Sequence, residues 1–190
     1  LQDNFMLTFS DQSLLIEALS TQLGNLLRGR GLSIVTAESC TGGWVGAALT
    51  QIPGSSGWFD RGFITYSNDA KREMLGVRAK TLDLHGAVSR QVVEEMAKGA
   101  LKKSRGTFSV AISGVAGPDG GTEEKPVGTV WMAWSIQGRV DSAVFCLPGD
   151  RQEVRAASVS LALQGLLVRI REWLALQPDE EFPVPLEQSE

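Results

Sequence analysis

The sequence predicts a single α/β domain with three layers, in which helices cover both faces of a mixed β-sheet. Short apolar runs typical of buried strands alternate with helical segments, and one pair of runs is joined by a tight turn. No internal repeat and no break in composition divides the chain. Its 190 residues, 43% of them hydrophobic, suit one globular core. We therefore expect one domain over residues 1–176.

Five segments have the apolar periodicity or the capping residues of helices. Ser67 or Asn68, Ser89 and Asp150 are placed to cap three of them, and Gly76 ends one. The expected helices cover residues 13–30, 44–51, a short segment after 67, residues 90–103 and residues 151–176.

The strands are expected from runs rich in apolar and β-branched residues. They cover residues 32–37, 59–66, 107–113, 128–136 and 140–147. The last two flank the turn formed by Gln137, Gly138 and Arg139, which predicts an antiparallel hairpin.

Composition and charge exclude several classes of protein. The net charge is -4, and the basic residues form no continuous stripe, so a nucleic-acid partner is not expected. No apolar run is long enough to cross a membrane, and the first fifteen residues lack the pattern of a signal peptide. Cys40 and Cys146 are too few for a disulfide framework, and no clustered ligands predict a metal. We expect a cytoplasmic enzyme without a cofactor, followed by a flexible acidic tail at 177–190.

Three unusual segments follow predicted strands. They cover residues 38–43, 66–71 and 113–121. In α/β sheets, ligands bind beyond the carboxyl ends of the parallel strands. The three segments are therefore expected to meet at one edge of the sheet and to form a site.

Ser39 is the candidate nucleophile of this edge. It lies at a strand-to-helix turn, where backbone N–H groups can stabilise an oxyanion, and Gly42 and Gly43 allow a ligand to approach the backbone. The alternative is that Ser39 or Thr41 only caps the following helix, which is the commoner role of such residues. Cys40 could act as a thiol nucleophile, but no histidine is paired with it by a local pattern.

A serine nucleophile needs a base. His85 is the only histidine, and it lies in an expected polar loop away from any strand end. Lys71 is the better candidate, because a lysine with a lowered pKa can replace histidine. Tyr66 ends a strand and Lys71 falls in the first turn of the next helix, so both can face one cleft. The alternative for Lys71 is an exposed position on the helix surface.

Two further features suggest an anion site. The glycine-rich segment 113–121 offers several backbone N–H groups, and the solvated continuation 122–126 could close over a ligand. Arg151 and Arg155 begin the last helix, where their charge opposes the helix dipole unless an anion is near. Pairing with Glu153 or with the acidic tail is the alternative. The tryptophans, Trp44 included, are expected in the core rather than as a base-stacking platform.

Five motifs in order resemble the CinA C-terminal-domain family. They are residues 36–43 (TAESCTGG), 63–71 (FITYSNDAK), 85–89 (HGAVS), 113–121 (SGVAGPDGG) and 125–131 (KPVGTVW). The resemblance covers about residues 13–175 and is strongest to stand-alone bacterial members. It implies a five-stranded, mostly parallel sheet with one antiparallel strand, no metal requirement, and commonly a homodimer. Many members have threonine where this chain has Ser113, and the hydroxyl is retained.

The resemblance also implies an activity, the conversion of nicotinamide mononucleotide (NMN) and water to nicotinate mononucleotide and ammonia, within pyridine nucleotide salvage. It implies a catalytic apparatus of serine, tyrosine and lysine, which falls on Ser39, Tyr66 and Lys71. Our hypothesis for the mechanism is that Lys71 takes the serine proton, directly or through Tyr66. The expected substrate-binding residues are Cys40, Thr41, Gly42, Gly43, Asn68, Ser113, Gly114, Gly117, Arg151 and Arg155. Two alternatives remain: a non-catalytic nucleotide-binding paralogue, and an amidase for another nucleotide amide.

Overall fold

Five strands form one sheet in the order β2-β1-β3-β4-β5. They are β1 (Ile34–Glu38), β2 (Phe59–Ile64), β3 (Phe108–Gly114), β4 (Thr129–Ile136) and β5 (Arg139–Cys146). In the computed structural model, which describes residues 9–177, β1 lies between β2 and β3 and is parallel to both. Strand β4 is antiparallel to β3 and β5. The mixed sheet with one antiparallel strand is therefore confirmed, as is the hairpin.

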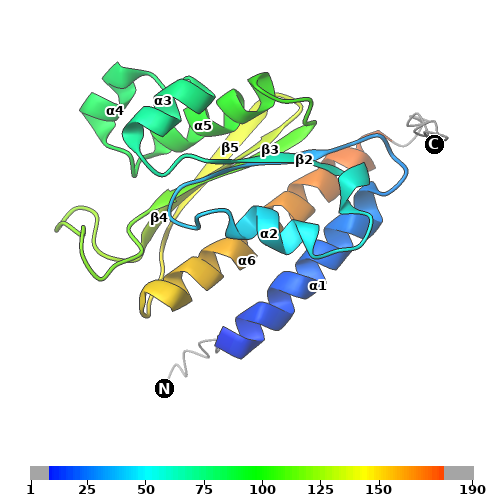
Figure 1. Cartoon of the computed structure of the whole chain (residues 1–190), viewed down its shortest axis with the longest axis horizontal. Coiled ribbons are helices and arrows are strands. Elements are labelled where there is room, and N and C mark those ends of the chain that lie inside the picture. The colour runs from blue at the N-terminus through cyan, green and yellow to red at the C-terminus, as the bar shows by residue number, and fades with distance from the viewer. Residues whose placement is uncertain (1–8, 178–190) are drawn as a thin grey trace.

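Helices form a layer on each face of the sheet (Figure 1). One layer holds α3 (Asn68–Leu75), α4 (Ala79–His85) and α5 (Arg90–Lys102), and the other holds α1 (Phe9–Leu27), α2 (Trp44–Thr50) and α6 (Arg151–Ala175). A short 3-10 helix, η1 (Ser55–Gly57), precedes β2. The expected three-layer α/β/α sandwich is confirmed.

The central strands are apolar because both of their faces are covered. All of β1 and nearly all of β3 are buried, whereas the edge strands β2 and β5 are partly exposed. The larger core, which includes Leu23, Trp58 and Met132, lies on the side of α1, α2 and α6. The smaller core includes Val35 and Met96 and lies on the side of α5. Continuous burial of this kind is expected for strands inside a doubly covered sheet.

The structure confirms the expected caps and corrects two helices. Ser67 and Ser89 accept hydrogen bonds from the third residue after them, and Asp150 forms a capping box with Glu153. Helix α4 was not expected, because its first residues carry no capping side chain. Contacts with α5 stabilise it instead, since Arg78 and Thr81 both donate to the Glu95 carboxylate. Helix α1 begins four residues earlier than expected and ends at Leu27 rather than at residue 30.

Close packing of α5 against α3 depends on Gly99. A Cβ atom at this position would overlap the carbonyl oxygen of Leu75. We expect Gly99→Ala to lower the free energy of unfolding by roughly 1–3 kcal/mol, because backbone atoms cannot move aside cheaply. Gly57→Ala is the matched control, since nothing lies within 4 Å of its Cβ position. Urea denaturation of both variants measures the difference, and equal stability would contradict the packing described for Gly99.

The expected acidic tail lies outside the described residues from position 178 onward. Within residues 9–177, no helix combines the length and apolar character needed to cross a bilayer.

Candidate active site

The carboxyl ends of the three parallel strands lie side by side, as the sequence predicted. Glu38, the last residue of β1, is in register with Ile64 of β2 and with Ile112 of β3. The pairing continues past the strand ends, because Ser39 donates its N–H to the carbonyl of Ile112 and Thr65 donates to the carbonyl of Glu38. Ser39 is thereby fixed at the middle of this edge.

Ser39 and Lys71 form a buried hydrogen-bonded pair. The Nζ atom of Lys71 lies 3.0 Å from Oγ of Ser39 and donates to the carbonyl oxygen of Thr65 at 2.8 Å. Lys71 is 1% exposed and Ser39 is 9% exposed. Burial lowers the pKa of Lys71 below its ordinary value of 10.5, and the neighbouring Cys40 thiol opposes part of that shift. The alternative of an exposed helix lysine is wrong, and the pair has the geometry of a nucleophile beside its base.

Ser39 does not cap helix α2. The N-cap residue is Gly43, at φ 94°, and it has no capping side chain. The N–H groups at the start of α2 are instead satisfied by Glu38, whose carboxylate accepts from Gly43, Val45 and Gly46. The hydroxyl of Thr41 also donates to Glu38 at 2.7 Å. The capping alternative for Ser39 and Thr41 is therefore wrong.

Glu38 is a site residue that the sequence analysis missed. Its carboxylate is 1% exposed and lies directly before the candidate nucleophile. A signal was present, because an acidic residue just before a helix start is favoured by the helix dipole. Within residues 9–177, the N–H groups of Cys40 and Thr41 donate to no other residue, although both residues are buried. These two groups are therefore the candidates for an oxyanion hole.

Tyr66 lies in the segment between β2 and α3 and is 60% exposed. Its phenol oxygen accepts a hydrogen bond from Nη2 of Arg151 at 3.0 Å. The phenol forms no hydrogen bond with Ser39 or Lys71, and those two residues contact each other directly. Asn68 is the exposed first residue of α3, and its side chain forms no hydrogen bond with the described part of the chain.

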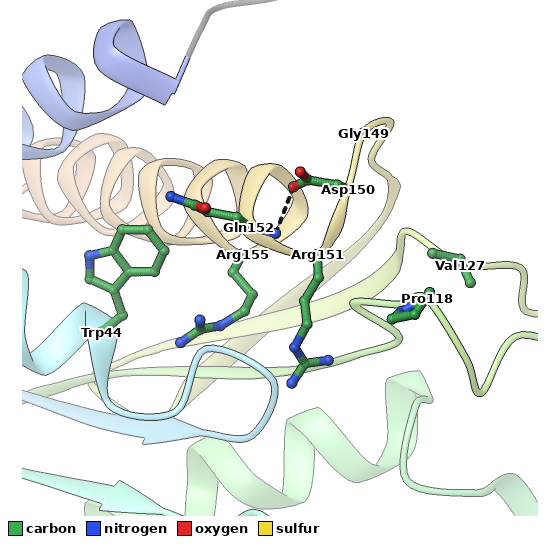
Figure 2. A pocket seen from close by; sticks show the side chains of 8 residues that line it. All are labelled: Trp44, Pro118, Val127, Gly149, Asp150, Arg151, Gln152 and Arg155. Atoms are coloured by element: carbon green, nitrogen blue, oxygen red, sulfur yellow. Dashed lines mark hydrogen bonds between the residues drawn. The ribbon is translucent and has the colours of Figure 1, made fainter.

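Arg151 and Arg155 project from the first turns of α6 toward the sheet edge (Figure 2). Arg151 donates to the carbonyl of Gly117 at 2.9 Å, in addition to Tyr66. Arg155 donates to the carbonyls of Cys40 and Thr41 at 3.1 and 3.0 Å. Neither guanidinium forms an ion pair with a carboxylate within residues 9–177. Pairing with Glu153 is wrong, because that side chain completes the cap of α6.

A cleft of about 780 Å³ opens beside these arginines. Figure 2 shows Trp44 on one side of the two guanidinium groups and Pro118 and Val127 on the other. The guanidinium of Arg155 lies 5.4 Å from the centre of the Trp44 ring, a cation–π distance. Trp44 was expected in the core but is only partly buried and lines the cleft, so that expectation is corrected. Gly149, Asp150 and Gln152 complete the lining.

The glycine-rich segment after β3 forms the far side of this region. Ser113 is buried, and its hydroxyl donates to the carbonyl of Ala87 at 2.8 Å, so it is committed to a backbone contact. Gly114 ends β3, and Gly117 is buried at φ 84°, with Val127 packed against it. The segment 122–126, expected to be free to close over a ligand, is attached through Lys125, whose Nζ donates to the carbonyl of His85. His85 itself is exposed and ends α4, rather than lying in a loop.

Comparisons with known proteins identify the family and the fold. A family model described as the CinA C-terminal domain matches residues 16–170. The chain belongs to this family.

Several curated relatives of this CinA domain are named as enzymes. The chain is 57% identical to the nicotinamide-nucleotide amidohydrolase PncC of Escherichia coli K12, over 78% of this chain and 90% of the relative. It is 51% identical to the protein of the same name from Pseudomonas putida, over 80% and 95% of the two chains. The crystal structure of the competence/damage-inducible protein CihA from Agrobacterium tumefaciens matches with a TM-score of 0.80 at 49% identity, covering 81% of this chain and 94% of the other.

The Cys40 thiol of this CinA domain is a weaker candidate nucleophile than Ser39. Burial raises the pKa of Cys40 to about 11, which keeps the thiol protonated near neutral pH. Because the thiolate is the reactive form, the alternative of a cysteine nucleophile loses its support. Within residues 9–177, no group of three His, Cys, Asp or Glu side chains lies close enough together to hold a metal ion.

Proposed function

We propose that this CinA domain hydrolyses the carboxamide of NMN to nicotinate mononucleotide and ammonia. The observation that carries the proposal is the 3.0 Å contact between Ser39 Oγ and Lys71 Nζ in a buried setting. The names of the relatives at 57% and 51% identity support a nicotinamide nucleotide as the substrate. The cleft beside Arg151 and Arg155 supplies two guanidinium groups that suit a phosphate, and Arg155 connects it to Cys40 and Thr41, the residues after Ser39.

The proposed reaction has two steps. Neutral Lys71 accepts the hydroxyl proton of Ser39 while Oγ forms a bond to the carboxamide carbon, and the N–H groups of Cys40 and Thr41 hold the oxyanion. The C–N bond then breaks, and Lys71 returns its proton to the leaving nitrogen, which departs as ammonia. Water next gives a proton to Lys71 and attacks the acyl carbon, and Ser39 leaves with that proton. Desolvation supports this role, because it keeps Lys71 unprotonated at a lower pH.

The direct path between Lys71 and Ser39 is the simpler of the two expected proton routes. The phenol of Tyr66 is held by Arg151 and is largely exposed. We place Tyr66 at the entrance of the site, where it contacts the nucleotide and orients Arg151. This assignment keeps Tyr66 in the site without requiring it to carry the proton.

Arg151 is proposed to bind the substrate phosphate. Removing one charged hydrogen-bond donor costs roughly 1.5–3 kcal/mol, so Arg151→Met should raise the KM for NMN about 10- to 100-fold. Hydrolysis of nicotinamide riboside, which lacks the phosphate, should change by less than about threefold, because it never had that contact. Initial rates of ammonia release from both compounds measure this difference. Equal losses on both substrates would contradict the phosphate assignment.

One assay distinguishes the proposed function from its alternatives. Ammonia release is compared for NMN, nicotinamide, nicotinamide riboside and the nicotinamide dinucleotide. Fastest turnover of NMN supports the proposal, whereas fastest turnover of another amide would identify a different nucleotide amidase. Absence of turnover for every compound would favour a non-catalytic nucleotide-binding protein.

We also propose that the protein works in the cytoplasm as a homodimer, in line with the family resemblance. Light scattering coupled to size-exclusion chromatography would test the dimer. A single species at the 20.4 kDa mass of one chain would contradict it.

A further inference from the structure

Glu38 is the most strongly hydrogen-bonded side chain of the site, yet it has no place in the reaction as described. Its two oxygens accept four hydrogen bonds, from the Thr41 hydroxyl and from the N–H groups of Gly43, Val45 and Gly46, at 2.7 to 3.0 Å. The side chain is 1% exposed. A buried carboxylate is costly unless donors satisfy it, and here every contact comes from one short segment, residues 41–46. Glu38 therefore ties the end of β1 to the start of α2.

The hydrogen bonds to Glu38 determine which backbone N–H groups after β1 remain available to a ligand. The first N–H groups of α2 are occupied by Glu38, so they are not available to an anion. On the other side of the same segment, Arg155 holds the carbonyls of Cys40 and Thr41. In a trans peptide the C=O and N–H point in opposite directions, so the Thr41 N–H points away from Arg155. Neither the Cys40 N–H nor the Thr41 N–H donates to another residue among residues 9–177, and both follow directly after Ser39 in the chain.

We propose that Glu38 is a positioning residue for the oxyanion hole, an inference that rests on the proposed amidohydrolase function. Its carboxylate holds residues 41–46 in the shape that presents the N–H groups of Cys40 and Thr41 to the oxygen that becomes negative when Ser39 attacks. Glu38 does not touch the substrate. It acts through the backbone, and its effect belongs to the transition state rather than to substrate binding.

Glu38→Gln tests this inference. Glutamine keeps the size of the side chain but places an N–H2 group against at least one of the four donors, so the segment must shift. Loss of an oxyanion-hole donor costs about 10²- to 10³-fold in kcat. A donor that is displaced but still present should lower kcat by less than a donor that is lost. We therefore expect kcat to fall roughly 10- to 100-fold, with the KM for NMN within about threefold of the value for the unaltered protein.

Ser109→Ala is the matched control. Its hydroxyl is equally buried and donates to the Ala97 carbonyl at 2.8 Å, but Ser109 lies at the opposite end of β3 from the site. It should leave kcat unchanged. Thr41→Val is the second variant, and it removes only the hydroxyl donor to Glu38. It should lower kcat by about threefold to tenfold without a change in KM, which keeps the test decisive even if Glu38→Gln does not fold.

The outcomes separate the inference from the proposed function. If the unaltered protein releases ammonia from NMN but both Glu38→Gln and Thr41→Val keep their kcat within about twofold, the positioning role is overturned and the function stands. A rise in KM with unchanged kcat would also overturn it, because that result indicates a role in binding. If the unaltered protein releases no ammonia from NMN, the proposed function fails, and the positioning role fails with it.

Discussion

Ser39→Ala is expected to reduce kcat for ammonia release from NMN by about 10⁴- to 10⁶-fold, the range seen when a serine nucleophile is removed from a hydrolase. The cause is the loss of the covalent intermediate, since the remaining groups can only promote slow attack by water. The fold should not change, because Ser39 keeps its backbone N–H bond to Ile112 and Lys71 keeps its bond to the Thr65 carbonyl. Initial rates at saturating NMN measure the effect.

The control measurement for this variant is its affinity for NMN. The Ser39→Ala protein should still bind NMN with a dissociation constant close to the KM of the unaltered protein, because the arginines and the cleft remain. A variant that released ammonia at the normal rate would show that the nucleophile lies elsewhere.

Lys71→Met is expected to reduce kcat by about 10²- to 10⁴-fold, the usual contribution of a general base. Methionine fills a similar volume but cannot accept the proton of Ser39. In the unaltered protein kcat/KM should rise with pH as Lys71 loses its proton, and the midpoint of that rise should lie below pH 10.5, because burial lowers the pKa of this group. The methionine variant should lack that rise.

Lys80→Met is the matched control, since Lys80 is an exposed lysine of α4. It should leave both the rate and the pH profile unchanged. A Lys71→Met protein that kept the ascending limb of the profile would show that another group is the base.

The same pair of variants reports on stability. In the unfolded chain Lys71 has its ordinary pKa of 10.5, and in the folded chain its pKa is lower. At pH values between these two pKa values the unfolded chain binds more protons than the folded one, so the free energy of unfolding rises with pH. Below the lowered pKa both states are protonated, and the folded state bears the cost of a buried ammonium. Lys71→Met should remove this pH dependence, and Lys80→Met should keep it, as measured by urea denaturation at several pH values.

Much of the fold could be predicted because its signals are local. Buried strands appear as β-branched apolar runs, and the caps at Ser67, Ser89 and Asp150 are set by residues within one turn of each helix. Helix α4 could not be predicted in this way. Its capping position carries no capping side chain, and it depends on Glu95, which comes from α5 and is distant in the sequence.

The position of the site could be predicted from the sequence, but only some of its side-chain contacts could. The three strand ends converge because parallel strands end at one edge, which the sequence indicated through the segments after them. Three features of the site depend on how the helices pack. Lys71 is buried by the packing of α3, Arg155 of α6 donates to the carbonyls of the loop after β1, and Trp44 of α2 lines the cleft. No periodicity in the sequence encodes such distances. The donors around Glu38 were within eight residues of it, but their convergence requires the left-handed turn at Gly42 and Gly43.

As the proposed nucleophile, Ser39 forms an acyl-enzyme with the nicotinoyl group of NMN. Hydroxylamine tests it most directly, because a strong nucleophile intercepts an acyl-enzyme in place of water. The unaltered protein should convert NMN to the nucleotide hydroxamate in proportion to the hydroxylamine added, and Ser39→Ala should not. Release of ammonia from NMN with no hydroxamate at any hydroxylamine concentration would show that water attacks the amide directly and that Ser39 forms no covalent intermediate.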